Sequence, residues 1–97
     1  MIQTFKNRPT RLLFEGEVPR ALPPDIVPRA RLLLKQLHAA VALGDMRVPP
    51  GNRLHALSGS RKGRHAVRIN DQWRLAFRWK DGNATEVEIV DYHGERR

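Results

Sequence analysis

The chain has 97 residues, 40% of them hydrophobic, so it can form one folded domain spanning residues 1–97 and has no room for a second core. It contains no cysteine, which excludes disulfides, thiolate metal sites and a cysteine nucleophile. No apolar run approaches membrane-spanning length, and Met1 to Pro9 lacks the apolar stretch of a signal peptide, so we expect a cytoplasmic protein.

The formal net charge of +8 indicates an acidic partner, which on composition alone is RNA, DNA, an anionic membrane surface or an acidic protein. The positive charge is concentrated between Arg47 and Lys80, where Asp71 is the single acidic residue. The alternative is that these cations are merely solvated surface groups.

Two short elements are predicted first. Ile2 to Phe5 alternates apolar and polar residues and predicts a short edge strand. A short helix follows, with Asn7 as N-cap, Pro9 in its first turn and Gly16 as its terminator.

The principal helix is expected to begin after Asp25 as N-cap and to end at Gly44. Pro28 falls in its first turn, where a missing N–H does no harm. A loop from Val48 to Gly63 comes next. The apolar residues that recur at helical spacing, and so predict the buried face, are Ile26, Ala30, Leu33, Leu34, Leu37 and Val41.

The carboxyl-terminal part changes to alternating periodicity and predicts three antiparallel strands. A three-residue loop, Asn70 to Gln72, pairs Val67 with Leu75 and keeps apolar residues on one face. A longer loop from Lys80 to Ala84 then sets Leu75 opposite Ile89 and Phe77 opposite Val87. The helices are expected to cover this apolar face.

The other face of these strands is largely charged. In this register Arg78 lies opposite Glu86, which favours a cross-strand ion pair. Arg74 lies opposite Val90 and is therefore the better candidate for binding a phosphate. The residues that share this face are Arg64, Ala66, Arg68, Arg74, Ala76, Arg78, Glu86, Glu88 and Val90.

Several motifs together resemble HigB-type toxins of the RelE/ParE superfamily. They are the strand Trp73-Arg74-Leu75-Ala76-Phe77-Arg78-Trp79, the turn Asp81-Gly82, the ending Val87-Glu88-Ile89-Val90-Asp91-Tyr92-His93, and upstream Arg53-Leu54-His55-Ala56-Leu57 and Ser58-Gly59-Ser60-Arg61-Lys62-Gly63. The resemblance covers essentially the whole chain. It implies a RelE-like α+β fold, in which two α-helices pack on one face of a small antiparallel sheet made of a short N-terminal strand and three C-terminal strands.

The resemblance also implies a function, the toxin of a type II toxin–antitoxin system that cleaves translated mRNA on the ribosome without a metal or other cofactor. The implied partners are the ribosome, mRNA and a HigA-type antitoxin with a helix-turn-helix domain. Operator DNA is reached only through that antitoxin, and no membrane is involved. Two departures are that Ser58 stands where lysine is frequent and that Arg64-His65 replaces a more aromatic strand start. Losing a lysine removes one phosphate contact.

By position, the resemblance assigns catalysis to His55, Arg74, Asp91, Tyr92 and His93. Metal-free cleavage through the RNA 2′-hydroxyl needs a base, an acid and cations for the charged transition state. Asp91 and His93 are suited to proton transfer, and Tyr92 to stacking on or orienting a base. Which group is base and which is acid stays open. The cations expected to hold RNA phosphates are Arg61, Lys62, Arg64, Arg68 and Arg78, together with Arg74.

Each assignment has a structural alternative. His55 alone is an ordinary loop histidine, and Asp91 either ends its strand or needs a buried partner. His38 is expected to be solvated and His65 to be packed.

Two other functions remain open, a ParE-like toxin that inhibits DNA gyrase by binding and a basic RNA- or DNA-binding module. The acid–base residues at the end of the chain favour the nuclease, because a protein that only binds has no chemical need for them.

Overall fold

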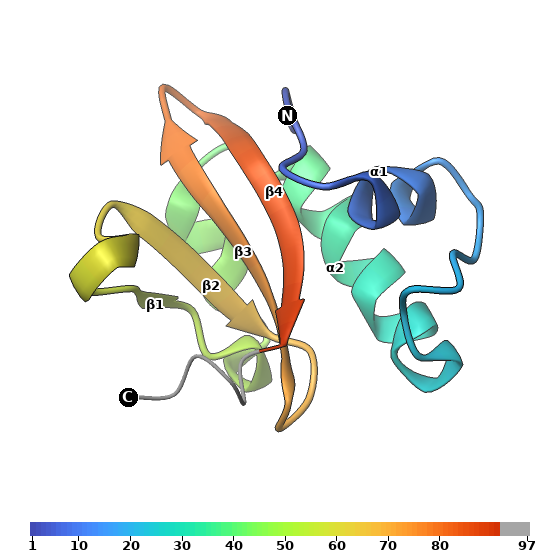
Figure 1. The fold of residues 1–97 in the computed structure, drawn as a ribbon. Helices are drawn as coiled ribbons and strands as arrows, with labels where there is room; N and C mark the ends of the chain where they lie inside the picture. Colours follow the sequence, from blue (N-terminus) through green and yellow to red (C-terminus); the bar gives the residue numbers. More distant parts are fainter. Residues whose placement is uncertain (92–97) are drawn as a thin grey trace.

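The computed structural model describes residues 1–91 and consists of two helices packed on one face of a four-stranded antiparallel sheet (Figure 1). The strands are β1 (His55–Ala56), β2 (Arg64–Arg68), β3 (Trp73–Lys80) and β4 (Asn83–Asp91), in the spatial order β1-β2-β3-β4. The helices are α1 (Arg8–Phe14) and α2 (Val27–Ala39). Four 3-10 turns are η1 (Pro24–Ile26), η2 (Leu43–Arg47), η3 (Pro50–Asn52) and η4 (Gly59–Arg61). The predicted α+β class is therefore confirmed.

The N-terminal segment lies along the free edge of β4. Ile2 and Phe5 form isolated parallel bridges with Ala84 and Val87, so the edge position is confirmed although the segment is not a regular strand. The fourth strand of the sheet is instead β1, which pairs with β2. The sequence predicts only a loop at β1, because two residues carry no measurable periodicity.

Helix α1 begins and ends as predicted. The Asn7 side-chain oxygen accepts hydrogen bonds from the Thr10 N–H at 3.1 Å and from the Thr10 hydroxyl at 2.6 Å, which satisfies an N–H at the helix start. Gly16 follows with a φ of 103°, a left-handed conformation that glycine adopts without strain.

Helix α2 differs from the prediction at both ends. Asp25 lies within η1 and does not cap the helix, whose N-cap residue Ile26 has no side-chain cap. The helix ends at Ala39 rather than Gly44, because the Asp45 carboxylate accepts hydrogen bonds from the Val41 and Ala42 N–H groups at 2.9 and 3.1 Å. Val41 was predicted on the buried face of this helix, but it lies beyond the helix end and is 81% exposed.

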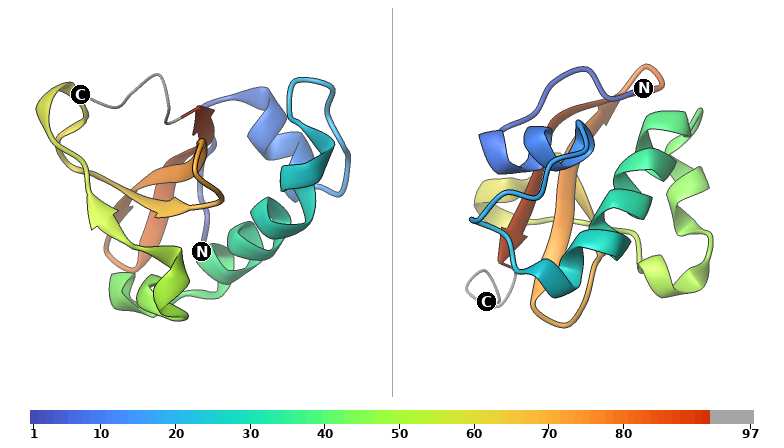
Figure 2. Two further views of the ribbon diagram at one scale, coloured as in Figure 1. Left: turned by 90° about the horizontal axis from the view of Figure 1, so that it is seen from below. Right: turned by 90° about the vertical axis from the view of Figure 1, so that its right-hand side faces the viewer.

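The core lies between the helices and the apolar face of the sheet. Helices α1 and α2 occupy the same side of the sheet, and neither covers the opposite face (Figures 1 and 2). Within residues 1–91, no helix is long and apolar enough to cross a lipid bilayer. The largest fully buried apolar side chains are Leu13, Leu33, Leu34, Leu37, Met46, Val67, Leu75, Phe77 and Val87.

The predicted register holds through the middle of the sheet. Val67 pairs with Leu75 and Leu75 with Ile89, so the apolar residues share one face. The Asn70 side-chain oxygen accepts from the N–H groups of Gln72 and Trp73, which closes the predicted three-residue loop.

The connection between β3 and β4 is shorter than predicted. Asp81 and Gly82 form a two-residue turn with φ angles of 52° and 80°, and Arg78 consequently lies opposite Thr85 rather than Glu86. A β-bulge follows at Glu86, whose φ is 52°. The bulge adds one residue to β4, and this extra residue restores the apolar register beyond it.

Candidate functional site

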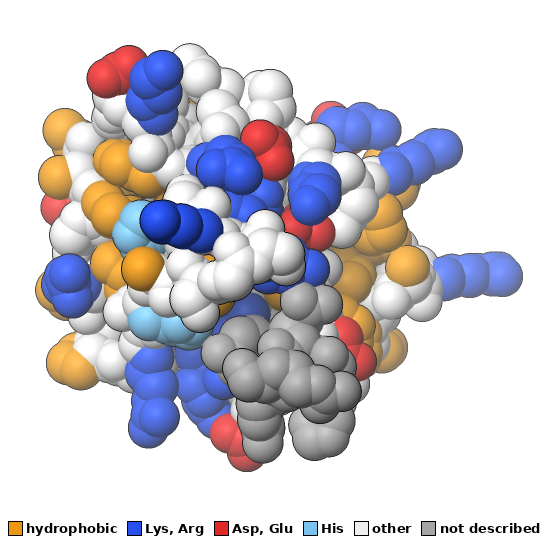
Figure 3. All heavy atoms as spheres, turned by 60° about the vertical axis from the view of Figure 1, so that its left-hand side comes forward, with side chains coloured by type: hydrophobic (Ala, Val, Ile, Leu, Met, Phe, Trp, Pro, Cys, Tyr) orange, Lys and Arg blue, Asp and Glu red, His pale blue; other side chains and the backbone are white. Residues whose placement is uncertain are grey.

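The candidate site lies on the sheet face that turns away from the helices, which we call the outer face. Lys, Arg and His side chains gather on the side of the molecule where β1 and β2 form the edge of the sheet (Figure 3). Glu86 lies at the bulge, and its carboxylate contacts Arg64 and Arg78 of this face, as predicted. By register and side-chain contacts, the residues of the outer face include His55 on β1, Arg64, Ala66 and Arg68 on β2, Arg74, Ala76 and Arg78 on β3, and Thr85, Glu86, Glu88 and Val90 on β4.

His55 is half-buried on the edge strand and pairs with Ala66. Its Nδ1 lies 2.9 Å from the Arg53 carbonyl oxygen. A carbonyl oxygen can only accept, so this contact is a hydrogen bond when the ring carries a proton on Nδ1. In the neutral ring Nε2, a buried atom, then bears the lone pair with which a histidine acts as a general base.

Two arginines lie one row along the sheet from His55. Arg68 pairs with Arg74 across β2 and β3. From strand spacing, their Cα atoms lie roughly 8 Å and roughly 12 Å from that of His55, within reach of long side chains contacting one substrate. Arg74 donates from Nη1 to the carbonyl oxygens of Asn70 and Trp73.

Arg68 forms an ion pair with Asp71 at the tip of the β2–β3 loop. The hydrogen bond from Arg68, together with its charge, lowers the pKa of the Asp71 carboxyl group. Asp71 is 96% exposed, so this ion pair is weak and Arg68 can exchange it for a phosphate.

Asp91 ends β4, where it is exposed and pairs with Trp73. One carboxylate oxygen accepts a hydrogen bond from the Gln72 side-chain amide at 3.0 Å. The exposed position at the end of the strand agrees with the first of the two alternatives predicted for Asp91, that it ends its strand. Tyr92 and His93, also predicted as catalytic, lie outside the described residues.

The loop before β2 supplies two of the predicted phosphate-binding cations. Lys62 is exposed just after η4 and forms no ion pair with any of residues 1–91. Arg61 is half-buried, and its guanidinium lies 3.4 Å from a Glu88 carboxylate oxygen. The two neighbouring cations therefore differ in how accessible they are to a ligand.

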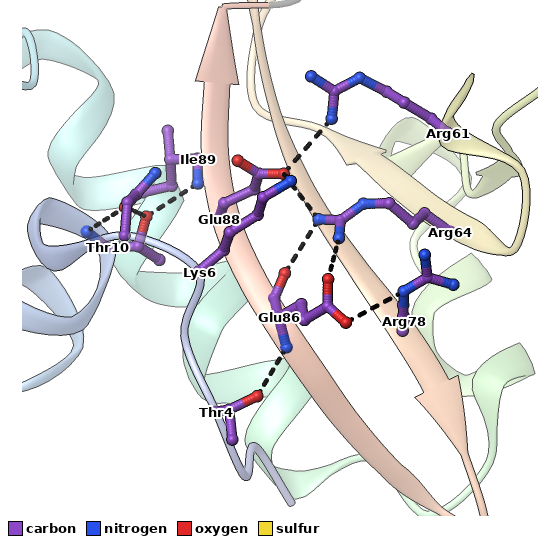
Figure 4. A network of polar contacts seen from close by, with 10 residues as sticks. Thr4, Lys6, Thr10, Arg61, Arg64, Arg78, Glu86, Glu88 and Ile89 are labelled. Carbon is purple, nitrogen blue, oxygen red and sulfur yellow. Dashed lines mark hydrogen bonds and ion pairs between the residues drawn. The ribbon is translucent and has the colours of Figure 1, made fainter. Parts of the chain in front are cut away.

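A buried carboxylate that sequence reasoning did not single out lies at the centre of these cations. One Glu88 oxygen is 2.8 Å from Arg64 Nη2, 3.4 Å from Arg61 and 3.6 Å from the Lys6 ammonium (Figure 4). Glu88 and Arg64 are only 6% and 3% exposed. The only available signal was a glutamate in register with the basic face, and that signal does not reveal burial.

Arg64 and Arg78, both predicted to contact RNA, are engaged with protein groups. Arg64 also contacts the Glu86 carboxylate at 3.2 Å and donates to the Glu86 carbonyl oxygen at 2.9 Å. Arg78 Nε lies 3.2 Å from Glu86, which is the ion pair predicted from the sequence despite the different register. In this arrangement the Arg64 guanidinium faces carboxylates rather than solvent.

The other two described histidines have structural contacts. His65 stacks on Phe77 with ring centroids 6.4 Å apart, as expected for a packed residue. Burial, followed by the nearby charges of His55 and Arg47, lowers the pKa of His65. His38 is exposed, as predicted, yet its Nδ1 accepts a hydrogen bond from the Ile2 N–H at 3.1 Å.

Comparison with known proteins covers nearly the whole chain. Residues 3–93 match the family model of the RelE-like toxin of the type II toxin–antitoxin system HigB. Toxin HigB-1 of Vibrio cholerae serotype O1 is 39% identical over 90 residues, which are 92% of this chain and 95% of the relative. Endoribonuclease HigB of Proteus vulgaris is 32% identical over 97 residues, covering 96% of this chain and 100% of the relative.

Solved structures share the fold at much lower identity. YafQ from E. coli superposes with a TM-score of 0.59 at 15% identity, covering 100% of this chain and 98% of that one. The toxin in the E. coli DinJ-YafQ toxin-antitoxin complex gives a TM-score of 0.56 at 15% identity, with coverage of 100% and 97%. At such identities the likeness establishes the RelE-like fold alone.

Proposed function

This chain belongs to the RelE-like toxins of the type II toxin–antitoxin system HigB, and from that membership we propose that it is an endoribonuclease that cleaves mRNA on the ribosome. A relative 32% identical over its full length is named Endoribonuclease HigB, which supports RNA as the substrate. The net charge of +8 favours association with RNA phosphates.

The observation that carries the proposal is the hydrogen bond of His55 to the Arg53 carbonyl oxygen, on the same face as Arg68 and Arg74. It directs the lone pair of the neutral ring to Nε2, away from the backbone. A base of this kind beside two guanidinium groups meets the needs of a reaction in which an RNA hydroxyl attacks its own neighbouring phosphate.

We assign the chemistry as follows. His55 removes the proton from the 2′-hydroxyl, and the resulting oxyanion attacks the adjacent phosphorus to form a 2′,3′-cyclic phosphate. The bond to the 5′-oxygen breaks, and this oxygen takes a proton from an acid supplied by the chain end, where Asp91 and His93 are the candidates. Arg74 stabilises the charge that develops on the phosphate, and Tyr92 orients a base.

The remaining cations divide into two groups in this proposal. Lys62 and Arg68 contact phosphates of the mRNA, because Lys62 is exposed and Arg68 is paired with a solvent-exposed carboxylate that a phosphate can replace. Arg61 can exchange Glu88 for a phosphate, whereas Arg64 and Arg78 act by holding β2, β3 and β4 together.

The proposed partners follow from the family. A toxin of a type II system is held inactive by an antitoxin, and we propose a HigA-type antitoxin whose helix-turn-helix domain carries the pair to operator DNA. The proposed site of action is the translating ribosome in the cytoplasm.

The test is cleavage of mRNA on programmed ribosomes by the wild type, His55→Ala and Arg74→Ala. We expect cleavage to fall about 10²-fold or more in both variants, because each loses a group that acts in the transition state. Arg20→Ala is the matched control, since Arg20 is exposed in the loop between α1 and α2 and should leave the rate unchanged. Circular dichroism confirms that each variant is folded.

Absence of cleavage by a wild-type protein that still arrests growth would contradict the proposal. Inhibition of DNA gyrase would then be measured next, because the same fold serves toxins that only bind.

A further inference from the structure

A buried amide holds together the segment that precedes β1. Asn52 is completely buried, and its Nδ2 donates to the Met46 carbonyl oxygen at 3.1 Å, to the Val48 carbonyl oxygen at 3.3 Å and to Gln36 Oε1 at 3.2 Å. These contacts tie η2, η3 and the intervening chain to α2. A buried amide with this many partners is strongly orienting, because any movement leaves polar groups unpaired.

The same amide is linked to the end of β2 by one guanidinium. Arg29 on α2 donates from Nη2 to Asn52 Oδ1 at 3.3 Å and to the Arg68 carbonyl oxygen at 3.1 Å. Its Nε donates to the Ile69 carbonyl oxygen at 3.0 Å. We call Arg29, Gln36 and Asn52 the Asn52 clamp. It fixes the segment before His55 and the strand end that carries Arg68 to one helix.

The residue that follows Asn52 in the sequence has an unusual backbone conformation. Arg53, the next residue, has φ 50° and ψ 53°, a left-handed conformation that costs a non-glycine residue free energy. This conformation orients the Arg53 carbonyl oxygen, which accepts the hydrogen bond from His55 Nδ1 at 2.9 Å.

We propose that the Asn52 clamp is a positioning device for His55, in which the buried amide holds Arg53 left-handed so that its carbonyl oxygen fixes the Nδ1–H tautomer. The role in cleavage rests on the proposed function, whereas the control of the tautomer does not. Asn52 and Arg53 act through His55 and touch no substrate. Because Arg29 also donates to the Arg68 carbonyl oxygen, the clamp fixes the position of His55 relative to Arg68.

The sharpest test uses two variants of one exposed residue. Arg53→Gly and Arg53→Val both remove the guanidinium, but glycine adopts the left-handed conformation freely whereas β-branched valine resists it. The tautomer of His55 is read from ring ¹⁵N chemical shifts of the isolated protein. We expect Nδ1–H to dominate in the wild type and in Arg53→Gly. The ratio of the Nδ1–H tautomer to the Nε2–H tautomer should fall roughly fivefold in Arg53→Val, because the loss of one ordinary hydrogen bond changes an equilibrium by about that factor.

Asn52→Asp tests the clamp itself. The carboxylate keeps an acceptor for Arg29 but cannot donate to the Met46 and Val48 carbonyl oxygens, so the tautomer ratio should fall as in Arg53→Val. Should Asn52→Asp fail to fold, the Arg53 pair still decides whether the left-handed turn controls His55. On programmed ribosomes kcat should fall in Arg53→Val relative to Arg53→Gly, with KM little changed.

Two results would overturn the proposal. One is a wild-type His55 protonated mainly on Nε2, and the other is an equal tautomer ratio in Arg53→Gly and Arg53→Val. The spectra are recorded without ribosomes, so absence of cleavage by the wild type, with the expected tautomers, would reject the nuclease and leave the positioning of His55 standing.

Discussion

The guanidinium of Arg64 donates from Nη2 to a carboxylate oxygen of Glu88 at 2.8 Å, and both side chains are almost completely buried. The pair lies on the outer face, which also carries the half-buried Arg68, Arg74 and Arg78. Lys6 and Arg61 reach the same carboxylate from the N-terminal segment and from η4. Glu88 therefore links β4 to the N-terminal segment and to the segment that contains η4 and the start of β2. Its negative charge also reduces the repulsion among Lys6, Arg61 and Arg64.

Replacing Glu88 with alanine should destabilise the fold strongly. Arg64 would lose its buried carboxylate partner and keep the half-exposed Glu86, so we expect the free energy of unfolding to fall by up to about 3–5 kcal/mol. The measurement is urea-induced unfolding followed by circular dichroism at neutral pH.

Glu15→Ala is the matched control for this prediction. Glu15 also pairs with an arginine, Arg11, at 3.3 Å, but both side chains are nearly half exposed on α1. An exposed pair of this spacing contributes about 0.5 kcal/mol or less. Equal losses in the two variants would show that burial of the Arg64–Glu88 pair has no special weight.

The hydrophobic pattern predicted the middle of the sheet well and its ends less well. Leu75 pairs with Ile89 as expected, because any one-residue slip would expose a row of apolar side chains. The length of the β3–β4 turn was wrong, because the bulge at Glu86 compensates for the odd residue and has no local sequence signal. The end of α2 was wrong because Asp45 competes for backbone N–H groups from outside the helix.

For the candidate site, the sequence placed the strand arginines on one face and assigned Arg78 an ion pair with Glu86, but it could not separate Arg64 from Arg68. Arg64 and Arg68 lie on the same strand and on the same face, so a pattern of period two does not distinguish them. Arg64 is buried because Glu88 and its neighbours enclose it, whereas Arg68 pairs with exposed Asp71. The distinction depends on which side chains approach from elsewhere in the fold, and a local pattern does not contain that information.

Replacing Thr10 with valine should break a buried link between α1 and β4. The Thr10 hydroxyl donates to Asn7 and accepts the Ile89 N–H at 2.9 Å, inside the protein. Valine has a similar shape but leaves that N–H without an acceptor, so we expect a loss of about 1–3 kcal/mol in thermal or urea unfolding. Thr10→Ser keeps the hydroxyl and should lose much less. A larger loss in serine than in valine would refute the hydrogen-bond explanation.

His65 should make the protein less stable as the solution is acidified. Burial lowers the pKa of His65 in the folded state below its ordinary value of 6.5. Between the two pKa values the unfolded chain binds more protons, so stability rises with pH across this window and falls as pH drops below about 6.5.

His65→Phe tests this effect because it keeps the stacking on Phe77 and cannot titrate. His65 Nδ1 is buried and finds no hydrogen-bond partner within the described part of the chain, so a phenyl ring should fit at little cost. We expect a smaller decrease in the urea midpoint between pH 7.5 and pH 5.5 in the variant than in the wild type. An identical decrease would assign the pH dependence to other groups.

Lys62 should contribute to the salt dependence of ribosome association, whereas Lys35 should not. Lys62 is exposed next to the outer face, where the proposed mRNA phosphates lie, and Lys35 is exposed on α2, across the sheet. Each phosphate contact to single-stranded RNA adds about 0.7 to the slope of log affinity against log salt concentration. Lys62→Ala should reduce the slope for mRNA-programmed ribosomes by about this amount, and Lys35→Ala should leave it unchanged. A slope reduced equally by both variants would mean that the charge acts through the general field of the protein rather than through a phosphate contact.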